Sequence, residues 1–285
     1  MSDARQRALM LAPFLVGVVA LVAVPAVTTF ALALFEYSLL ASPEFIGLDN
    51  LRALFDDPFF AEAVENSLLL AAIAVPLRVA GALGLALLLT RGFRFAGAHR
   101  TIAYLPTVVP ETAYALLWLF LLNPLFGPVN GLLGAIGLPQ PEWLTDPTAA
   151  FVAMILITAF TIGEGFVIAL AVRQEISGEL YDLARLEGAT PFSTFRRVTL
   201  PLMAPALGLL ALRDTAFLLQ ASFTPAYLLT DGGPDLATLF LPVYVFDVGF
   251  EQFRYGYAAA MTLAMFLITL LLSVAAAVLV RLRMR

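Results

Sequence analysis

The sequence contains no cysteine and no lysine, and its single histidine is His99. Without cysteine it has no disulfide and no zinc–thiolate site, and without lysine it has no P-loop lysine or Schiff-base lysine. Charged residues make up only 13% of the 285 residues, about half the share usual in soluble domains, whereas 61% are hydrophobic. A water-soluble fold of this length cannot bury so much apolar surface. The composition therefore excludes an ordinary soluble enzyme and a disordered chain, and it indicates an integral membrane protein.

Six apolar stretches have about the 20 residues that a helix needs to cross a bilayer. They lie at approximately 9–35, 64–89, 101–122, 149–172, 202–224 and 257–280. The first runs well past the apolar region of a signal peptide, so we expect it to be retained as a span. A further apolar stretch, 236–250, is short and contains Pro242. It is predicted to be an interfacial or re-entrant piece on the outer side instead of a seventh span.

The arginines predict the orientation. Twelve of the sixteen precede the first stretch, follow the last, or fall between stretches two and three or four and five. Because positive residues gather on the cytoplasmic side of a membrane, we expect both termini in the cytoplasm. Two arginines, Arg78 and Arg213, fall within spans, and Arg78 is predicted to contact another subunit or to snorkel toward the interface. With no internal repeat, residues 1–285 are predicted to form one all-α membrane domain of six helices.

The inner loop 173–200 is predicted to form two short helices joined by a turn. Gly188 suits a helix end with a positive φ, and Thr190 and Pro191 suit the N-cap and first position of the second helix. Four apolar residues of the first helix share one face: Ile176, Leu180, Leu183 and Ala184. Two interpretations stay open, a helical hairpin on the bilayer surface and a docking device that inserts into a groove of a partner subunit.

The same loop resembles the EAA loop of ABC importer permeases, which has a Gly-Ala pair, then a Phe, then Leu-Pro and a second Pro at fixed spacing. Asp182, Leu183 and Glu187 differ from the family pattern, which has Glu, Ala and Asp there. The resemblance implies that the loop docks into a separate ATPase subunit. The residues expected to make this coupling contact are Asp182, Leu183, Ala184, Glu187, Gly188, Ala189 and Phe195.

Four further segments, 45–51, 123–130, 229–234 and 250–258, resemble the carbohydrate permeases of maltose and glycerol-phosphate type. This resemblance implies the type I ABC importer permease fold in a bacterial or archaeal inner membrane. The partners it implies are a different second permease, two ATP-binding subunits and an extracytoplasmic solute-binding protein. The loop expected to face that binding protein comprises Asp231, Gly232, Gly233 and Pro234.

Polar residues within the spans are candidates for a solute path, because charges in a membrane are costly and usually face the bundle interior or water. Arg213, Phe217 and Gln220 share one helical face. Arg213 and Asp214 have alternative interpretations as an inner gate or a structural ion pair, and Phe217 as core packing. The full set of candidates is Glu164, Arg213, Asp214, Phe217, Gln220, Phe223 and Tyr227.

These features predict a translocation-pore subunit of an ATP-driven importer for a sugar or oligosaccharide. The resemblance implies that the chain is not an enzyme and binds no metal or cofactor, since ATP and Mg²⁺ belong to the ATPase subunits. Glycerol phosphate, a polyol or, less readily, a peptide remain alternative solutes. A self-sufficient secondary transporter or a membrane enzyme is an alternative class, which the missing inverted repeat and the partner-shaped loop disfavour. The net charge of −5 argues against a nucleic-acid partner.

Overall fold

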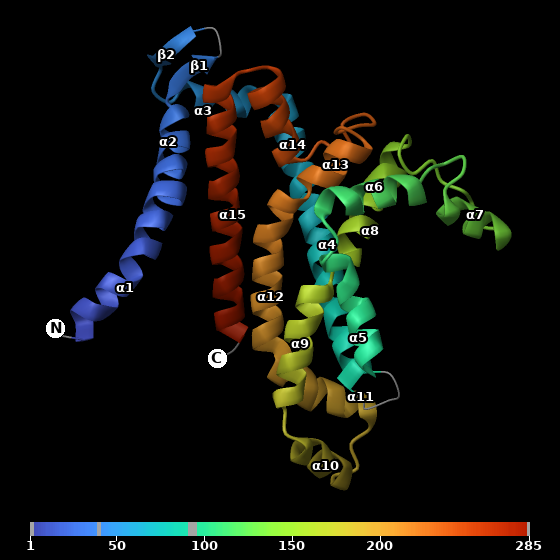
Figure 1. Ribbon diagram of the computed structural model, residues 1–285. Coiled ribbons are helices and arrows are strands. Elements are labelled where there is room, and N and C mark those ends of the chain that lie inside the picture. The colour runs from blue at the N-terminus through green and yellow to red at the C-terminus, as the bar shows by residue number, and fades with distance from the viewer. Residues whose placement is uncertain (1–2, 39–40, 91–95, 284–285) are drawn as a thin grey trace. The chain divides into compact units, whose positions relative to one another are not determined.

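The computed structural model describes residues 3–38, 41–90 and 96–283 (Figure 1). Arg91, Arg94 and Arg285, which contribute to the predicted orientation, lie outside these residues. The chain divides into two compact units. Unit 1 comprises residues 1–61 and 244–267, and unit 2 comprises residues 62–243 and 268–285.

The described residues are mostly helical. The first part of the chain contains α1 (Asp3–Val18), α2 (Val24–Leu32), β1 (Phe35–Ser38), β2 (Ala41–Phe45), α3 (Asp49–Ala53) and α4 (Pro58–Thr90). The middle contains α5 (Ala96–Tyr104), α6 (Glu111–Leu121), α7 (Pro128–Ala135), α8 (Pro147–Phe160) and α9 (Gly163–Glu175). The last part contains α10 (Gly178–Leu186), α11 (Pro191–Thr194), α12 (Leu200–Ala221), α13 (Phe223–Leu229), α14 (Leu241–Phe246) and α15 (Tyr255–Arg283).

Four helical segments of the described residues are long and apolar enough to cross a membrane: Met10–Leu32, Pro58–Thr90, Pro191–Leu229 and Tyr255–Val278. Two bent helix pairs raise the number to six if each counts as one span. The pair α5–α6 bends by 96° and the pair α8–α9 by 44°. The predicted spans 101–122 and 149–172 therefore each consist of two helices with a break between them. Pro106 and Pro110 explain the first break, because proline cannot continue the hydrogen-bond ladder of a helix.

The segment 236–250 contains only the short helix α14 and one π-helical turn, Asp247–Glu251. Neither belongs to the helices long enough to span a membrane, in agreement with the prediction that this segment is not a seventh span.

Unit 1 contains a β-hairpin that the all-α prediction missed. Its strands β1 and β2 are antiparallel, with Phe35 opposite Phe45 and their rings 5.4 Å apart. Asn50, in α3, donates side-chain hydrogen bonds to the carbonyl oxygens of Ala33 (3.1 Å) and Phe35 (2.9 Å). Asn50 therefore holds the chain where α2 leads into the hairpin. This residue belongs to the segment 45–51, and the contact gives it a structural role.

Asp57 joins three elements of unit 1. Its Oδ2 accepts hydrogen bonds of 2.7 Å from the hydroxyl groups of Tyr244 and Tyr257, and its Oδ1 accepts from the backbone N–H groups of Phe59 and Phe60. Burial raises the pKa of the Asp57 carboxyl, but the hydrogen bonds outweigh burial and the pKa lies below its ordinary value. Burial and the bond to Asp57 raise the pKa of Tyr244. The ionised carboxylate therefore stabilises the junction of α4, α14 and α15.

The core of unit 2 lies between α4, α9 and α12. Small residues let these helices approach closely: a Cβ at Gly165 would lie 3.4 Å from Ala82, and one at Gly81 would lie 3.0 Å from Ile162. The buried cluster comprises Ala82, Ala86, Leu89, Phe166, Ala169, Leu170, Met203, Leu207 and Leu210. The helices α4, α9 and α12 thus form the packed part of unit 2, whereas the pairs α5–α6 and α8–α9 contain the breaks.

Gly256 generates a test of the packing in unit 1. A Cβ at this position would overlap the carbonyl oxygen of Phe35 and lie 3.1 Å from the amide nitrogen of Tyr37. Gly256→Ala should lower the stability of the detergent-solubilised chain by about 1–3 kcal/mol, because the strand must move away from α15. Thermal unfolding measures the change. The matched control is Gly84→Ala, which meets no atom within 4 Å and should be neutral or slightly stabilising. Equal melting of both variants would contradict the close contact.

Candidate functional site

The loop 173–200 contains the first short helix that the sequence predicts, α10, whereas the second, α11, begins at Pro191 as predicted but continues into α12. Ser177 and Thr190 cap α10 and α11 by accepting hydrogen bonds from the N–H groups of Glu179 and Ser193. Gly188 has φ +73°, and the next amide donates to the carbonyl oxygen of Ala184 at 2.9 Å. The helix end at Gly188 and the cap at Thr190 are therefore confirmed.

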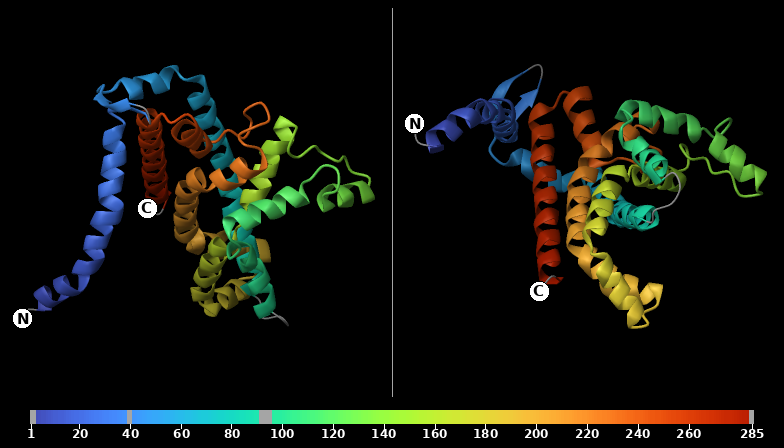
Figure 2. Two further views of the ribbon diagram at one scale, coloured as in Figure 1. Left: turned by 45° about the horizontal axis from the view of Figure 1, so that its top comes forward. Right: turned by 60° about the horizontal axis from the view of Figure 1, so that its bottom comes forward.

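The helix α10 lies at one end of unit 2, beyond the ends of α9 and α12 (Figure 1; right-hand view of Figure 2). Its apolar side chains are exposed, Leu183 at 57% and Leu186 at 84%. Asp182 and Arg185 form an exposed ion pair of 3.1 Å beside them. Exposed apolar side chains grouped in this way mark a surface for contact with a protein or with the membrane.

Tyr181 anchors α10 to the rest of unit 2, and the sequence analysis missed it. Its hydroxyl lies 3.1 Å from Oγ1 of the buried Thr199, and the guanidinium of Arg173 lies 4.2 Å from its ring centroid. Arg173 lies in the last turn of α9 and Thr199 directly precedes α12. One side chain thus joins α10 to α9 and to the start of α12. Only one feature of the sequence could have indicated this contact: Tyr181 is an aromatic residue among the acidic residues of the loop.

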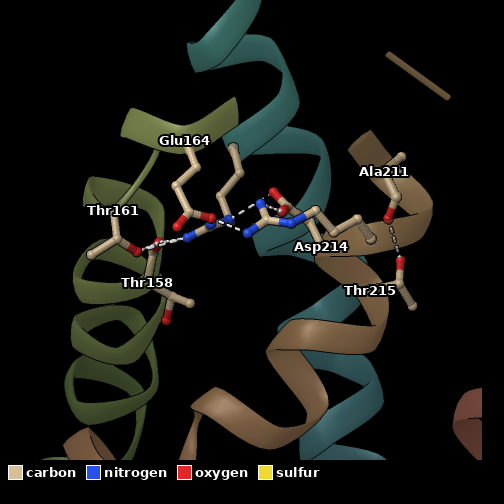
Figure 3. Close-up of polar contacts among 8 residues, drawn as sticks. Thr158, Thr161, Glu164, Ala211, Asp214 and Thr215 are labelled. Carbon is tan, nitrogen blue, oxygen red and sulfur yellow. Dashed lines mark hydrogen bonds and ion pairs between the residues drawn. The ribbon is translucent and has the colours of Figure 1, made fainter. Parts of the chain in front are cut away.

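A chain of four charged groups in unit 2 runs from a buried pair, Arg78 and Asp214, to a partly exposed pair, Arg213 and Glu164 (Figure 3). Arg78 Nε lies 2.9 Å from Asp214 Oδ2, with side chains 4% and 5% exposed. The other oxygen of Asp214 lies 3.4 Å from Arg213, which also pairs with Glu164. These contacts join α4, α9 and α12. The pair Arg78–Asp214 is deeply buried, so each charge depends on the other for stabilisation.

Arg78 also compensates for the break between α8 and α9. Its Nη1 donates to the carbonyl oxygen of Thr158 at 2.6 Å and to Oγ1 of Thr161 at 2.7 Å. The carbonyl at the end of α8 has lost its helical partner, and the guanidinium supplies the donor. The prediction that Arg78 contacts another subunit or snorkels is therefore wrong, because its charge is paired inside this chain.

A cavity of about 200 Å³ lies beside this network, between the two helix breaks. Both broken pairs, together with α4, α12 and α13, contribute to its wall. The lining residues are Arg78, Pro106, Thr107, Val109, Glu111, Tyr114, Ile157, Thr158, Thr161, Glu164, Phe217, Ala221 and Pro225. Hydroxyl groups, two carboxylates, the Arg78 guanidinium and the rings of Tyr114 and Phe217 thus surround a space inside the apolar region of the chain.

The cavity includes part of the predicted solute path. Glu164 and Phe217 line it, and Arg213 and Asp214 lie directly behind Glu164 in the charge network. Gln220 is exposed and lies outside the lining.

Phe223 and Tyr227, the other two path candidates, stack on each other with centroids 5.3 Å apart and also lie outside the lining. The roles of all seven path residues stay predictions.

The loop predicted to face a binding protein forms a tight turn after α13. Asp231 and Gly232 have φ +49° and +79°, and Gly233 donates its N–H to the carbonyl oxygen of Thr230 at 2.9 Å. Thr238 donates to the carbonyl oxygen of Gly233 at 2.7 Å and its hydroxyl contacts that of Thr230. The geometry presents Asp231 at an exposed tip.

The apolar helices and the two broken helix pairs together define a multi-pass membrane protein. Residues 79–285 match the family described as binding-protein-dependent transport system inner membrane component, and the chain belongs to this family. The resemblance of the inner loop to ABC importer permeases is thereby confirmed.

Two relatives show the range of the family. The chain is 33% identical over 246 residues to the diacetylchitobiose uptake system permease protein NgcF of Streptomyces coelicolor, and the match covers 79% of this chain and 68% of the relative. It is 33% identical over 237 residues to the lactose transport system permease protein LacF of Rhizobium radiobacter, and that match covers 81% of this chain and 79% of the relative.

A solved structure has a similar fold. A chain in the crystal structure of a bacterial alginate ABC transporter, in complex with alginate pentasaccharide-bound periplasmic protein, superposes with a TM-score of 0.82. The two chains are 24% identical, and the match covers 97% of this chain and 94% of the other. The architecture of broken and continuous helices is thus that of an ABC importer permease.

The buried ion pair generates a prediction. Arg78→Met or Asp214→Leu alone should destabilise the chain by about 3–5 kcal/mol, because each leaves an uncompensated charge in the interior. The double variant should recover much of that loss, since no unpaired charge remains. The folded fraction after heating in detergent measures these effects.

The exposed pair Asp182–Arg185 provides the control. Arg185→Ala should change stability by less than about 1 kcal/mol, because water screens that pair. A double variant of Arg78 and Asp214 as unstable as the sum of both single variants would contradict the assigned pairing.

Proposed function

We propose that this chain is a translocation-pore subunit of an ATP-driven importer that receives a sugar or oligosaccharide from an extracytoplasmic binding protein. The chain crosses a bacterial or archaeal inner membrane six times, with both termini in the cytoplasm. Its partners are a different second permease and two ATPase subunits, which hold ATP and Mg²⁺. The chain itself binds no cofactor and catalyses no reaction.

The exposed, anchored helix α10 carries this proposal. Its leucines offer an apolar face for a groove on the ATPase, and Tyr181 connects that face to α9 and α12. A rigid contact of this kind transmits a displacement of the ATPase to the membrane helices. The names of the relatives support a carbohydrate as the solute. Glycerol phosphate or a polyol is the second candidate for the solute.

The docking face is testable in vesicles that contain the assembled transporter. Leu183→Asp should reduce uptake at least about tenfold while the chain remains in the membrane, because a charge would be desolvated in the ATPase groove. The matched control is Glu179→Gln, an exposed change on the same helix. Uptake is compared at equal amounts of permease. Normal uptake by the Leu183 variant, or by a variant lacking residues 182–189, would exclude the proposed coupling.

Tyr181 provides a separate test of how the contact is transmitted. Tyr181→Ala removes both its hydroxyl contact and the ring under Arg173. We expect ATP hydrolysis to continue while the solute moved per ATP falls several-fold, because α10 then moves independently of α9 and α12. Tyr181→Phe keeps the ring and should retain more of the coupling. An unchanged ratio of uptake to hydrolysis in both variants would show that α10 transmits motion by another route.

A further inference from the structure

Apart from Arg78, the polar side chains that line the cavity are hydrogen-bond acceptors. Each lining hydroxyl group donates its proton to a backbone carbonyl: Thr107 to Tyr104, Tyr114 to Ile157, Thr158 to Met154 and Thr161 to Thr158. Their oxygens keep lone pairs, so they still accept. Glu111 and Glu164 add carboxylate oxygens, which accept only. A ligand in this cavity therefore meets acceptors and must supply the donors itself.

The cations near the cavity already have anionic partners. Arg78 is directed to Asp214 and to the end of α8, and its side chain is 4% exposed. Arg213 contacts Glu164 and Asp214 and lies over the ring of Phe217 at 5.7 Å. An incoming anion would have to compete with these carboxylates for the arginines, and at the buried Arg78 it would leave Asp214 unpaired in the interior.

Glu111 gives the cavity an excess of negative charge. Within the described part of the chain, its side chain takes part in no hydrogen bond or ion pair. It stands in the first turn of α6, as Glu164 stands in the first turn of α9. The positive ends of both helix dipoles at the cavity thus already have a carboxylate nearby.

We propose that this cavity is a subsite for neutral, polyhydroxylated solutes and discriminates against anionic ones such as uronates and phosphate esters. Sugar hydroxyl groups supply the donors that the wall lacks, and Phe217 offers an apolar face to a sugar ring. Glu111 is its specificity-determining residue. This inference rests on the proposed function, which it narrows by disfavouring glycerol phosphate as the solute.

The absence of cysteine permits a direct measurement of the charge in the cavity. A single thiol is introduced at Ala221, which lines the cavity, in the full-length chain of the assembled transporter. Its rates of reaction with cationic methanethiosulfonate ethyltrimethylammonium and anionic methanethiosulfonate ethylsulfonate are measured, with the chain lacking the thiol as background. The ratio of the two rates is divided by the ratio for 2-mercaptoethanol. We expect the normalised ratio to exceed about five in favour of the cationic reagent. One carboxylate without a partner, at close range in a partly shielded site, attracts the cationic reagent to this extent.

Glu111→Gln should lower this ratio several-fold, whereas the matched control Glu62→Gln, an exposed glutamate outside the lining, should leave it unchanged. A second thiol at Val109 repeats the measurement in case Ala221→Cys fails to assemble. Three results would overturn the proposal. They are a ratio near that of the free thiol, a preference for the anionic reagent, and no reaction at either position. Because the reagents need no transport, a preserved ratio in a chain that imports nothing would refute the proposed function alone.

Discussion

The ion pair between Arg78 and Asp214 is the contact on which unit 2 depends. It places one cation and one anion deep in the packing of α4 and α12, where neither tolerates the loss of its partner. The same guanidinium also binds the free end of α8. A single side chain thereby stabilises both a helix contact and a helix interruption, and the interruption borders the cavity. Packing of small residues between α4, α9 and α12 keeps this arrangement in register.

The apolar helices and the turn in the loop 173–200 could be predicted from the sequence because each depends on local pattern. Hydropathy identifies the apolar stretches, and Gly188 and Thr190 specify the turn by their own backbone chemistry. The breaks could be anticipated only in part. Pro106 and Pro110 signalled the first one, whereas the second one falls at Thr161, where no proline stands, and depends on Arg78 from another helix.

The candidate site was only partly predictable for a similar reason. Glu164, Arg213 and Asp214 stood out as charges in apolar stretches, and they do form one network. Which of them faces a cavity follows from how α8–α9 and α5–α6 bend, which no residue pattern of either segment specifies. Tyr181 was missed because its partners, Arg173 and Thr199, lie on different helices. The hairpin of unit 1 was missed because its strands are only four and five residues long.

The position of the two helix breaks has a mechanical consequence. An uninterrupted helix is stiff along its whole length, whereas a break concentrates compliance at a few residues. Here both compliant points border the cavity, while α4, α9 and α12 remain tightly packed beside it. A modest swing of α6 or α8 about its break therefore alters the volume and opening of the cavity without dismantling the bundle. The chain thus combines three tightly packed helices with two helix breaks, and the cavity lies at those breaks.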